Sequence, residues 1–212
     1  MKTHVYFFSL LLSATVVAQP DSNAQHMKQF APVENVYVEF GGLSPMGTLR
    51  EYQKASANFG FWAVAKRFAN EQLEAGFNLT LAKPGKAFTS QKFDSIFSNR
   101  AKAVSGMIGL RYARRYPMGK GGSWTAEVFP SLGYGFFGYE SQLKSTQSDG
   151  QIPDGERKFK ALSTIHVGQG FRINYKNVGL QAQYQFTPYD WFSRNDETIG
   201  AHSLTFGIVY RQ

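Results

Sequence analysis

Few residues of this sequence could carry out nucleophilic or acid–base chemistry. The candidates are His166 and the adjacent residues His202 and Ser203. A nucleophile and its base must lie within hydrogen-bond reach of each other. Neighbouring residues of a β-strand point to opposite faces, so His202 and Ser203 do not meet this requirement on a strand. His166 is expected to be a hydrogen-bonded interior residue, and we predict no catalytic residues.

The sequence also lacks the patterns of a cofactor or metal site. It contains no Cys, which excludes disulfide bonds, thiolate metal sites and a lipid-bearing cysteine. No pair of histidines has H-x-x-x-H spacing. We therefore expect no cofactor and no metal.

The remaining chemistry is charge pairing. Charged and amide side chains alternate with apolar ones in several segments, and charges in a narrow interior must be paired to be stable. Arg111 and Glu127 lie on neighbouring segments joined by 114–123, and we predict that they pair across the sheet. Together with Glu74, the predicted structural polar network comprises Glu39, Arg111, Glu127, His166, Arg172, Gln181, Gln183 and Gln185.

The elements that position these side chains are β-strands. The segment Val178–Phe186 reads V-G-L-Q-A-Q-Y-Q-F, so it has one apolar face and one face of glycine and glutamine. Strand lengths are expected to be close to the roughly 9 to 11 residues that a tilted membrane strand requires. Similar alternation predicts seven more strands, at 35–42, 58–67, 73–81, 103–113, 124–139, 163–175 and 201–210.

Two strands contain irregular features. Phe61 and Trp62 are adjacent, so the alternation leaves open which of them faces inward. Pro130 lies inside the segment 124–139 and lacks a backbone N–H. A proline in a strand is typical of edges and bulges, so we predict a local bulge or break in the ladder there.

The connections between the predicted strands alternate in length. The short ones are 68–72, 114–123 and 176–177, and the long ones are 43–57, 82–102, 140–162 and 187–200. Short periplasmic turns and long outer loops are typical of an even-stranded membrane barrel.

Aromatic residues form two predicted belts, at the levels where such rings lie in membrane interfaces. The belt near the short turns comprises Tyr112, Trp124, Tyr175 and Tyr210, and the belt near the long loops comprises Phe136, Phe186, Tyr189 and Trp191.

The amino terminus has the features of a secretory signal peptide. Lys2 is followed by the apolar run Val5–Leu12, and Val16 and Ala18 have the spacing of a cleavage site. We expect a signal peptide at 1–18, a periplasmic lead-in at 19–34 and one barrel domain at 35–212.

Composition is compatible with a barrel. Aromatic residues make up 16% of the 212 residues, and the mean hydropathy of -0.33 does not exclude a membrane strand protein, because alternation hides its apolar face. The net charge of +8 comes without a basic cluster interleaved with stacking aromatics, so we expect no nucleic-acid partner. Anionic lipid headgroups are the expected counter-charge.

The run Pro130–Phe136, the eight-strand layout and the closing Leu204–Tyr210 together resemble the small porin-family outer-membrane β-barrel proteins of Gram-negative bacteria. The resemblance spans roughly residues 35–212. It implies an all-β fold, an eight-stranded antiparallel up-and-down transmembrane β-barrel in the outer membrane. Such proteins commonly end on an aromatic residue, whereas this sequence ends Tyr210-Arg211-Gln212.

About eight strands enclose an interior just wide enough for side chains to fill, so we expect a plugged lumen and a structural or surface-binding role. The expected partners are outer-membrane lipid and lipopolysaccharide, the barrel-assembly machinery and an envelope protein bound through the long loops. Phe88, Phe93, Ile96 and Phe97 place apolar groups in one such loop, either over the barrel mouth or at a partner site. The alternatives are a narrow gated pore, a soluble lipocalin-like binding barrel with its faces reversed, and an outer-membrane lipid-modifying enzyme.

Overall fold

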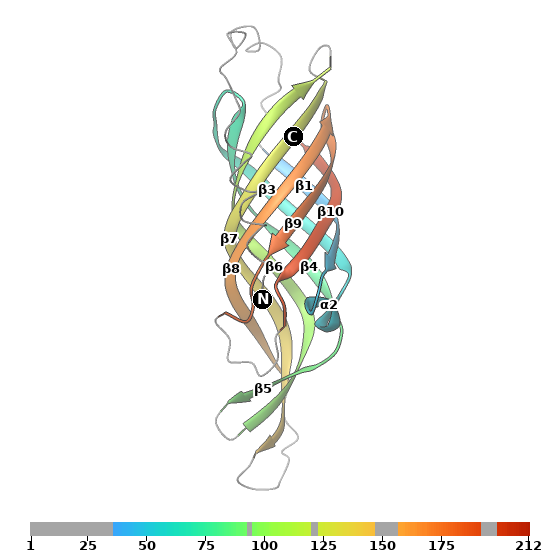
Figure 1. Ribbon diagram of the computed structural model, residues 1–212, viewed down its shortest axis with the longest axis vertical. Helices are drawn as coiled ribbons and strands as arrows, with labels where there is room; N and C mark the ends of the chain where they lie inside the picture. Colours follow the sequence, from blue (N-terminus) through green and yellow to red (C-terminus); the bar gives the residue numbers. More distant parts are fainter. Residues whose placement is uncertain (1–35, 93–94, 120–122, 147–156, 192–198) are drawn as a thin grey trace, which may run out of the picture. The chain divides into compact units, whose positions relative to one another are not determined.

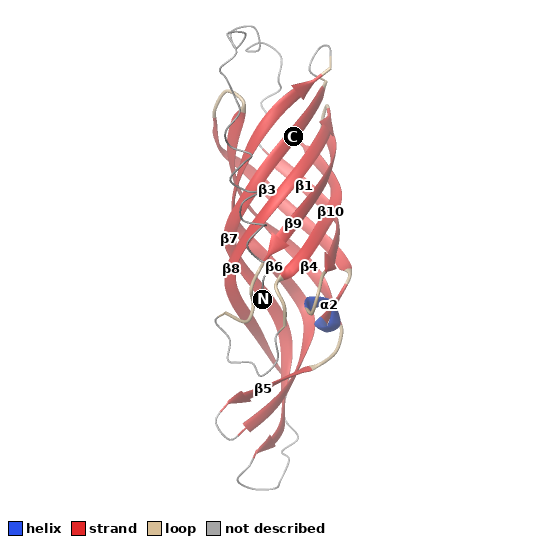
Figure 2. Ribbon diagram, viewed as in Figure 1, coloured by secondary structure: helices blue, strands red, loops and turns tan. Residues whose placement is uncertain are grey.

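The structure is a computed structural model that describes residues 36–92, 95–119, 123–146, 157–191 and 199–212. The expected signal peptide and lead-in lie outside the described residues, as does Phe93. Nearly all of the described chain is β-strand (Figure 2). The elements are β1 (Val36–Pro45), α2 (Leu49–Tyr52), β2 (Gln53–Lys54), β3 (Ser56–Arg67), β4 (Glu71–Pro84), β5 (Phe88–Lys92), β6 (Ser95–Met118), β7 (Trp124–Thr146), β8 (Lys158–Tyr175), β9 (Val178–Phe186) and β10 (His202–Arg211).

In the described part of the chain, eight antiparallel strands form a closed ring (Figure 1). The order around the ring is β1, β10, β9, β8, β7, β6, β4 and β3, and pairing between β4 and β6 closes the side opposite β10. Strands β2 and β5 pair only with β4 and β6, respectively, at one end of the barrel. The predicted eight-stranded up-and-down barrel is confirmed.

The two ends of the barrel differ. We call the end formed by the β3–β4, β6–β7 and β8–β9 turns the short-turn end. The first residue of β1 and the carboxy terminus also lie there, where the backbone N–H of Val36 donates to the carbonyl of Gln212 at 3.0 Å. The two-residue turn at Lys176 and Asn177 is as predicted, and Lys176 has φ +51°. The long-loop end carries α2, β2 and β5.

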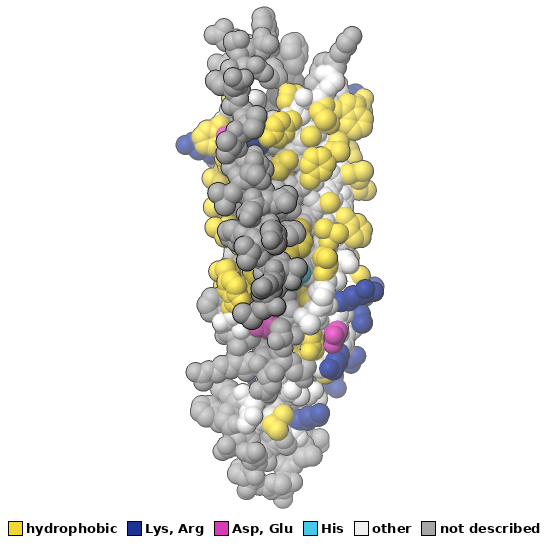
Figure 3. Space-filling view, viewed as in Figure 1, with side chains coloured by type: hydrophobic (Ala, Val, Ile, Leu, Met, Phe, Trp, Pro, Cys, Tyr) yellow, Lys and Arg dark blue, Asp and Glu magenta, His cyan; other side chains and the backbone are white. Residues whose placement is uncertain are grey.

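Side chains alternate between a polar interior and an apolar exterior. Leu132, Leu180 and Phe206 on the outer face are 63%, 67% and 56% exposed, whereas Glu39, Glu127 and other polar residues are buried inside. Figure 3 shows apolar side chains gathered in a wide band across the face of the barrel wall that is in view. This facing contradicts the soluble lipocalin-like alternative, which requires an apolar interior and a wet exterior, and it is the arrangement of a transmembrane barrel.

The structure resolves the facing of the second strand. Trp62 is fully buried in the lumen, and Phe61 is 38% exposed outside. A register shift between Val64 and Lys66 follows near the end of β3.

One sequence-based expectation about the strands is wrong. Strands β6, β7 and β8 have 24, 23 and 18 residues, because strand pairing continues beyond the barrel into segments predicted to be connections. The predicted break in the ladder at Pro130 is confirmed: the pairing of β7 with β6 skips Tyr112 and Ala113 beside it. The break is not a bulge, because β7 pairs continuously with β8 past Pro130 and its register with β6 is the same before and after it.

The aromatic belt at the short-turn end lies as expected, with Tyr112, Trp124, Tyr175 and Tyr210 each 41% to 48% exposed. At the long-loop end, Trp191 is exposed and packs against Phe186. Tyr189, however, is 7% exposed and lies inside the barrel mouth, so its placement in the outer belt is wrong. Among the described residues, no helix is long and apolar enough to cross a membrane.

Candidate functional site: the barrel lumen

The lumen near the short-turn end is filled by a cluster of ion pairs, which we call the ion-pair layer: Glu74, Arg115, Glu127, Arg172 and Arg211. Arg172 is central, because it lies 2.9 Å from Glu74 and 2.9 Å from Glu127. Glu127 also contacts Arg115 at 3.1 Å and Arg211 at 3.9 Å. The side chains of Arg172, Glu74 and Glu127 are fully buried, so each charge depends on these partners for its stability.

A second ion pair lies at mid-lumen. Arg111 of β6 binds both carboxylate oxygens of Glu39 from β1, and it donates to the Gln183 side chain at 3.0 Å. The predicted pairing of Arg111 with Glu127 is therefore wrong. Arg111 lies opposite Ser131 in the ladder, and Arg115, four residues further along β6, lies opposite Glu127.

Aromatic rings separate the two guanidinium groups. The Arg111 guanidinium lies 3.7 Å from the ring centroid of Trp62 and 4.8 Å from that of Phe129. Arg172 lies 4.8 Å from the same Phe129 ring and 4.5 Å from Tyr37. Each cation thus faces π-systems in a water-poor interior, where such contacts are strongest.

Gly170 makes room for this arrangement. A Cβ atom at Gly170 would lie 2.2 Å from the Phe129 ring, closer than any side chain tolerates. Glycine at the inward position of β8 therefore lets the Phe129 ring extend across the lumen between the two arginines.

Above the ion pairs, toward the long-loop end, the lumen is polar but uncharged. His166 contacts the Thr187 hydroxyl at 2.9 Å and the Ser131 hydroxyl at 3.4 Å, and Gln183 donates to the same Ser131 oxygen at 2.8 Å. Ser203 donates to Gln185 at 3.3 Å. His166, Thr187, Gln185 and Ser203 border a cavity of about 20 Å³, roughly the space for a single water molecule.

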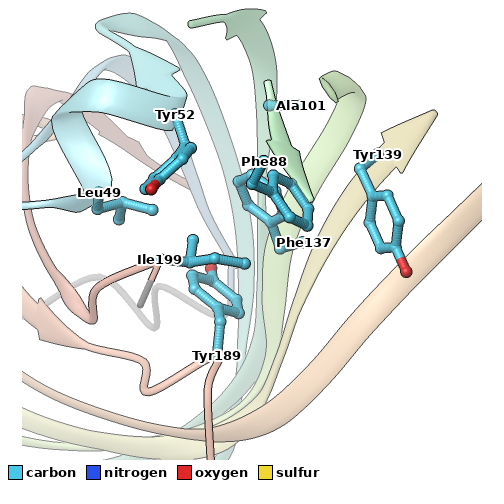
Figure 4. Packing of buried hydrophobic residues seen from close by; sticks show 8 residues of the cluster. All are labelled: Leu49, Tyr52, Phe88, Ala101, Phe137, Tyr139, Tyr189 and Ile199. Carbon is cyan, nitrogen blue, oxygen red and sulfur yellow. The ribbon is translucent and has the colours of Figure 1, made fainter. Parts of the chain in front are cut away.

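The long-loop end of the lumen is closed by apolar side chains, which we call the mouth cluster: Leu49, Tyr52, Phe88, Ala101, Phe137, Tyr139, Tyr189 and Ile199. They come from α2, β5, β6, β7 and the β9–β10 connection and converge inside the barrel (Figure 4). Leu49 and Tyr189 also border the small cavity, so the cluster lies directly over it. Burial raises the pKa of the Tyr189 hydroxyl, which therefore stays uncharged at neutral pH.

Phe88 belongs to the mouth cluster and has no exposed surface. The sequence left open whether the apolar groups of this loop lie over the barrel mouth or at a partner site, and Phe88 lies over the mouth. Asp190 links the two ends of the connection that contributes Tyr189 and Ile199. Its carboxylate accepts hydrogen bonds from the backbone N–H groups of Ile199 and Gly200 at 2.9 and 3.2 Å.

All eight residues of the predicted polar network face the lumen and are at most 7% exposed. Sequence reasoning missed two further charges. Arg115 lies in a segment predicted to be a turn, and Arg211 follows the predicted end of the last strand. Ala113 faces inward, so alternation predicts that Arg115, two residues later, also faces inward. Tyr210 faces outward, so alternation predicts that the next residue, Arg211, faces inward.

The lumen holds three carboxylates and four guanidinium groups among the described residues, and ion pairs connect each of them to at least one partner of opposite charge. The described residues contain no group of three or more side chains suited to hold a metal ion. His202 and Ser203 point to opposite faces as expected: Ser203 is buried, and His202 packs against the rings of Tyr184 and Phe186.

No protein-family model matches the sequence, and no curated protein matches it. Among solved structures, the chain is similar to Ail, the attachment invasion locus protein of Yersinia pestis, in complex with the heparin analogue sucrose octasulfate. The identity is 13% and the TM-score 0.44, over 84% of this chain and 97% of that one. For Neisserial surface protein A the identity is 11% and the TM-score 0.36, over 84% of this chain and 96% of that one.

Likenesses at these levels carry no argument about function. The assignment rests instead on the closed ring of strands and on the apolar exterior around a polar lumen, which together are the mark of a bacterial outer-membrane barrel. The chain is an eight-stranded outer-membrane β-barrel. The described side chains of its lumen form an ion-pair layer, a second ion pair, a neutral polar region around a cavity of about 20 Å³, and the mouth cluster.

Proposed function

We propose that this outer-membrane barrel is a closed protein with a structural or surface-binding role and without chemistry of its own. The observation that carries the proposal is the packing of buried side chains in the lumen around a cavity of only about 20 Å³. From the short-turn end to the mouth, the lumen contains paired charges, then neutral hydrogen-bonded groups, then the apolar mouth cluster.

A conduit is disfavoured by the same geometry. Passage of a solute would require separation of Arg172 from its two carboxylates, which would leave buried charges unpaired. It would also require displacement of the Phe129 ring beside Arg172. An enzymatic role is disfavoured because His166 and Ser131 are 1% and 4% exposed, between the ion pairs and the mouth cluster. A substrate would have to pass one of these barriers to reach them.

The proposal also includes the route to the membrane and the partners there. Residues 1–18 serve as a signal peptide cleaved near Ala18, residues 19–34 form a periplasmic lead-in, and the barrel-assembly machinery inserts residues 35–212. In the membrane the barrel contacts lipid and lipopolysaccharide, and its long-loop end is the surface offered to an envelope partner. Mass spectrometry of protein purified from outer membranes should give a chain that begins at or near Gln19; an intact amino terminus would contradict the signal peptide.

Conductance measurements test the closed lumen. Purified protein in planar bilayers should give only small, irregular current steps. Stable openings on the order of a nanosiemens, as expected of a water-filled barrel wider than eight strands allow, would contradict the proposal.

A further inference from the structure

Four basic side chains, which we call the basic patch, lie exposed on the outer surface at the long-loop end: Arg50, Lys54, Lys83 and Lys86. Arg50 belongs to α2, Lys54 to β2, Lys83 to β4 and Lys86 to the connection that follows. In Figure 3, Lys and Arg side chains gather at this end of the wall, beyond the apolar band. The exposed Glu51 lies among them, so the patch carries a net charge of +3.

Backbone pairing forces two of these charges together. Lys54 and Lys83 are direct partners in the β2–β4 ladder. Directly opposed Cβ atoms in an antiparallel pair are about 4.5–5.5 Å apart, and like charges at such positions are destabilising. Within the described residues, none of the four basic side chains of the patch takes part in an ion pair.

The backbone around the patch is held by hydrogen bonds and by the mouth cluster. The backbone N–H groups of Gly85 and Lys86 donate to the carbonyls of Tyr52 and Glu51 at 2.8 and 2.7 Å. The backbone N–H of Lys83 donates to the Ser56 hydroxyl at 3.1 Å. Leu49 and Tyr52 anchor α2 from inside the barrel. The like-charged pair is therefore built into the fold and is not a result of loose side chains.

The patch lies at the boundary of the apolar band. Leu81 is 65% exposed on the outer face of β4, and Lys83 follows on the same face two residues later. A strand rises about 3.4 Å per residue, so Lys83 is displaced along the strand by about 7 Å at most from a lipid-facing leucine. Lipid headgroups are expected at this level, just beyond the apolar band.

Among the residues that the structure describes, some basic ones elsewhere at this end take part in ion pairs, unlike those of the basic patch. Lys102 of β6 forms an ion pair with Glu140, which also lies 3.9 Å from Arg157. Glu140 thus offsets part of the positive charge around the β6–β7 hairpin. The basic patch keeps a net charge of +3, which attracts an external anion.

We propose that the basic patch binds a phosphate group of a lipid headgroup in the leaflet at the long-loop end, with Lys54 and Lys83 as its two principal contacts. This site rests on the proposed function, in which the barrel contacts lipid. It specifies where on the barrel the lipid binds and which chemical group is recognised. Apolar chains of the lipid would lie along the outer face of β3 and β4, beside Leu81.

Lipid retention in a neutral detergent tests the site. Wild-type protein in maltoside micelles is titrated with bisphosphorylated lipid A and, in parallel, with dephosphorylated lipid A, and bound lipid is counted by native mass spectrometry. The double substitution Lys54→Gln/Lys83→Gln should weaken binding of the bisphosphorylated lipid by about 30-fold, since each basic residue near an anionic surface contributes a factor of about five. It should leave the weak binding of the dephosphorylated lipid unchanged.

The matched control is Lys144→Gln/Lys158→Gln, which removes the same charge from exposed positions on β7 and β8 at the same end of the barrel. Its affinity should stay within about twofold of wild type. The variant Lys54→Arg/Lys83→Arg keeps the charge and should retain binding, which separates loss of charge from misfolding.

Equal binding by wild type and Lys54→Gln/Lys83→Gln would overturn the proposal, as would full competition by millimolar inorganic phosphate, because the ligand would then be a soluble anion. These outcomes are independent of the conductance test. An open channel would contradict the closed-barrel function and leave the lipid result as it is, whereas equal lipid binding would contradict only this site.

Discussion

The two ends of the lumen are filled by different chemistry. At the short-turn end, Arg172, Glu74 and Glu127 close the barrel through ion pairs between β8, β4 and β7. At the long-loop end, Phe88, Phe137 and other apolar side chains close it through contacts between loops and hairpin extensions.

This difference predicts different mechanical behaviour. The ion pairs connect strands of the continuous ladder, so the removal of one member leaves a charge buried in the barrel. The mouth cluster lies where strands leave the ring, and segments of this kind open locally at lower free energy than the whole fold. We therefore expect the short-turn end to set global stability and the long-loop end to set local opening.

The largest expected effect is that of Arg172→Ala. It leaves Glu74 and Glu127 without their central cation and should lower the free energy of unfolding by about 3 to 5 kcal/mol. Reversible refolding in lipid vesicles, followed by tryptophan fluorescence in urea, measures the change. The control Arg114→Ala removes a half-exposed arginine whose 3.8 Å contact with Glu71 is expected to contribute less than about 1 kcal/mol. Equal losses in the two variants would contradict the special role of the lumen charge.

The exterior should respond by depth in the membrane. Leu180 is 67% exposed on the outer face of β9, and Leu180→Arg should cost about 2 to 4 kcal/mol if the residue lies at the bilayer midplane. Phe159→Arg, at an exposed position near the long-loop start of β8, should cost about 1 kcal/mol or less in the same refolding assay. Gln183 is no neutral comparison, because it lies 3.0 Å from Arg111 in a packed interior. Similar costs at Leu180 and Phe159 would show that the apolar band is misplaced.

At the mouth, Phe88→Ala should act locally. The lost ring contacts with Tyr52 and Tyr139 should increase opening of the β4–β5 connection, seen as tryptic cleavage after Lys86 that is at least about tenfold faster. The unfolding free energy of the barrel should fall by less than about 1 kcal/mol. Phe159→Ala serves as the control for a large ring lost from the surface. A loss of barrel stability as large as that of Arg172→Ala would remove the distinction between the two ends.

The strands and their facing could be predicted from the sequence because period-two alternation is a local property. Val178–Phe186 was predicted with both boundaries correct, since its two faces differ at every position. The ends of β6, β7 and β8 could not be placed, because beyond the membrane a paired hairpin needs no apolar face. Pro130 could be linked to a break in the ladder, because proline has no N–H to donate, whereas its length of only two pairs and the unchanged register could not be predicted.

The lumen residues were predictable as a set but not as pairs. Inward facing follows from alternation along each strand, whereas partners depend on the stagger between strands, which one sequence does not contain. Glu127 therefore was assigned to Arg111 instead of Arg172, Arg115 and Arg211. Contacts across the lumen, such as Arg111 with Glu39, join residues of strands that are not neighbours in the ring.

Specific ion pairs close the lumen, and a double-mutant cycle tests their pairing most directly. Glu39→Ala, Arg111→Ala and the double variant are refolded in vesicles, together with the corresponding cycle for Arg111 and Glu127. The pair Glu39/Arg111 should show a coupling free energy of about 1 to 3 kcal/mol, so that the double variant loses less stability than the sum of the single ones, while Arg111 and Glu127 should be additive within about 0.5 kcal/mol. Additivity for Glu39 and Arg111, with strong coupling for Arg111 and Glu127, would contradict the account.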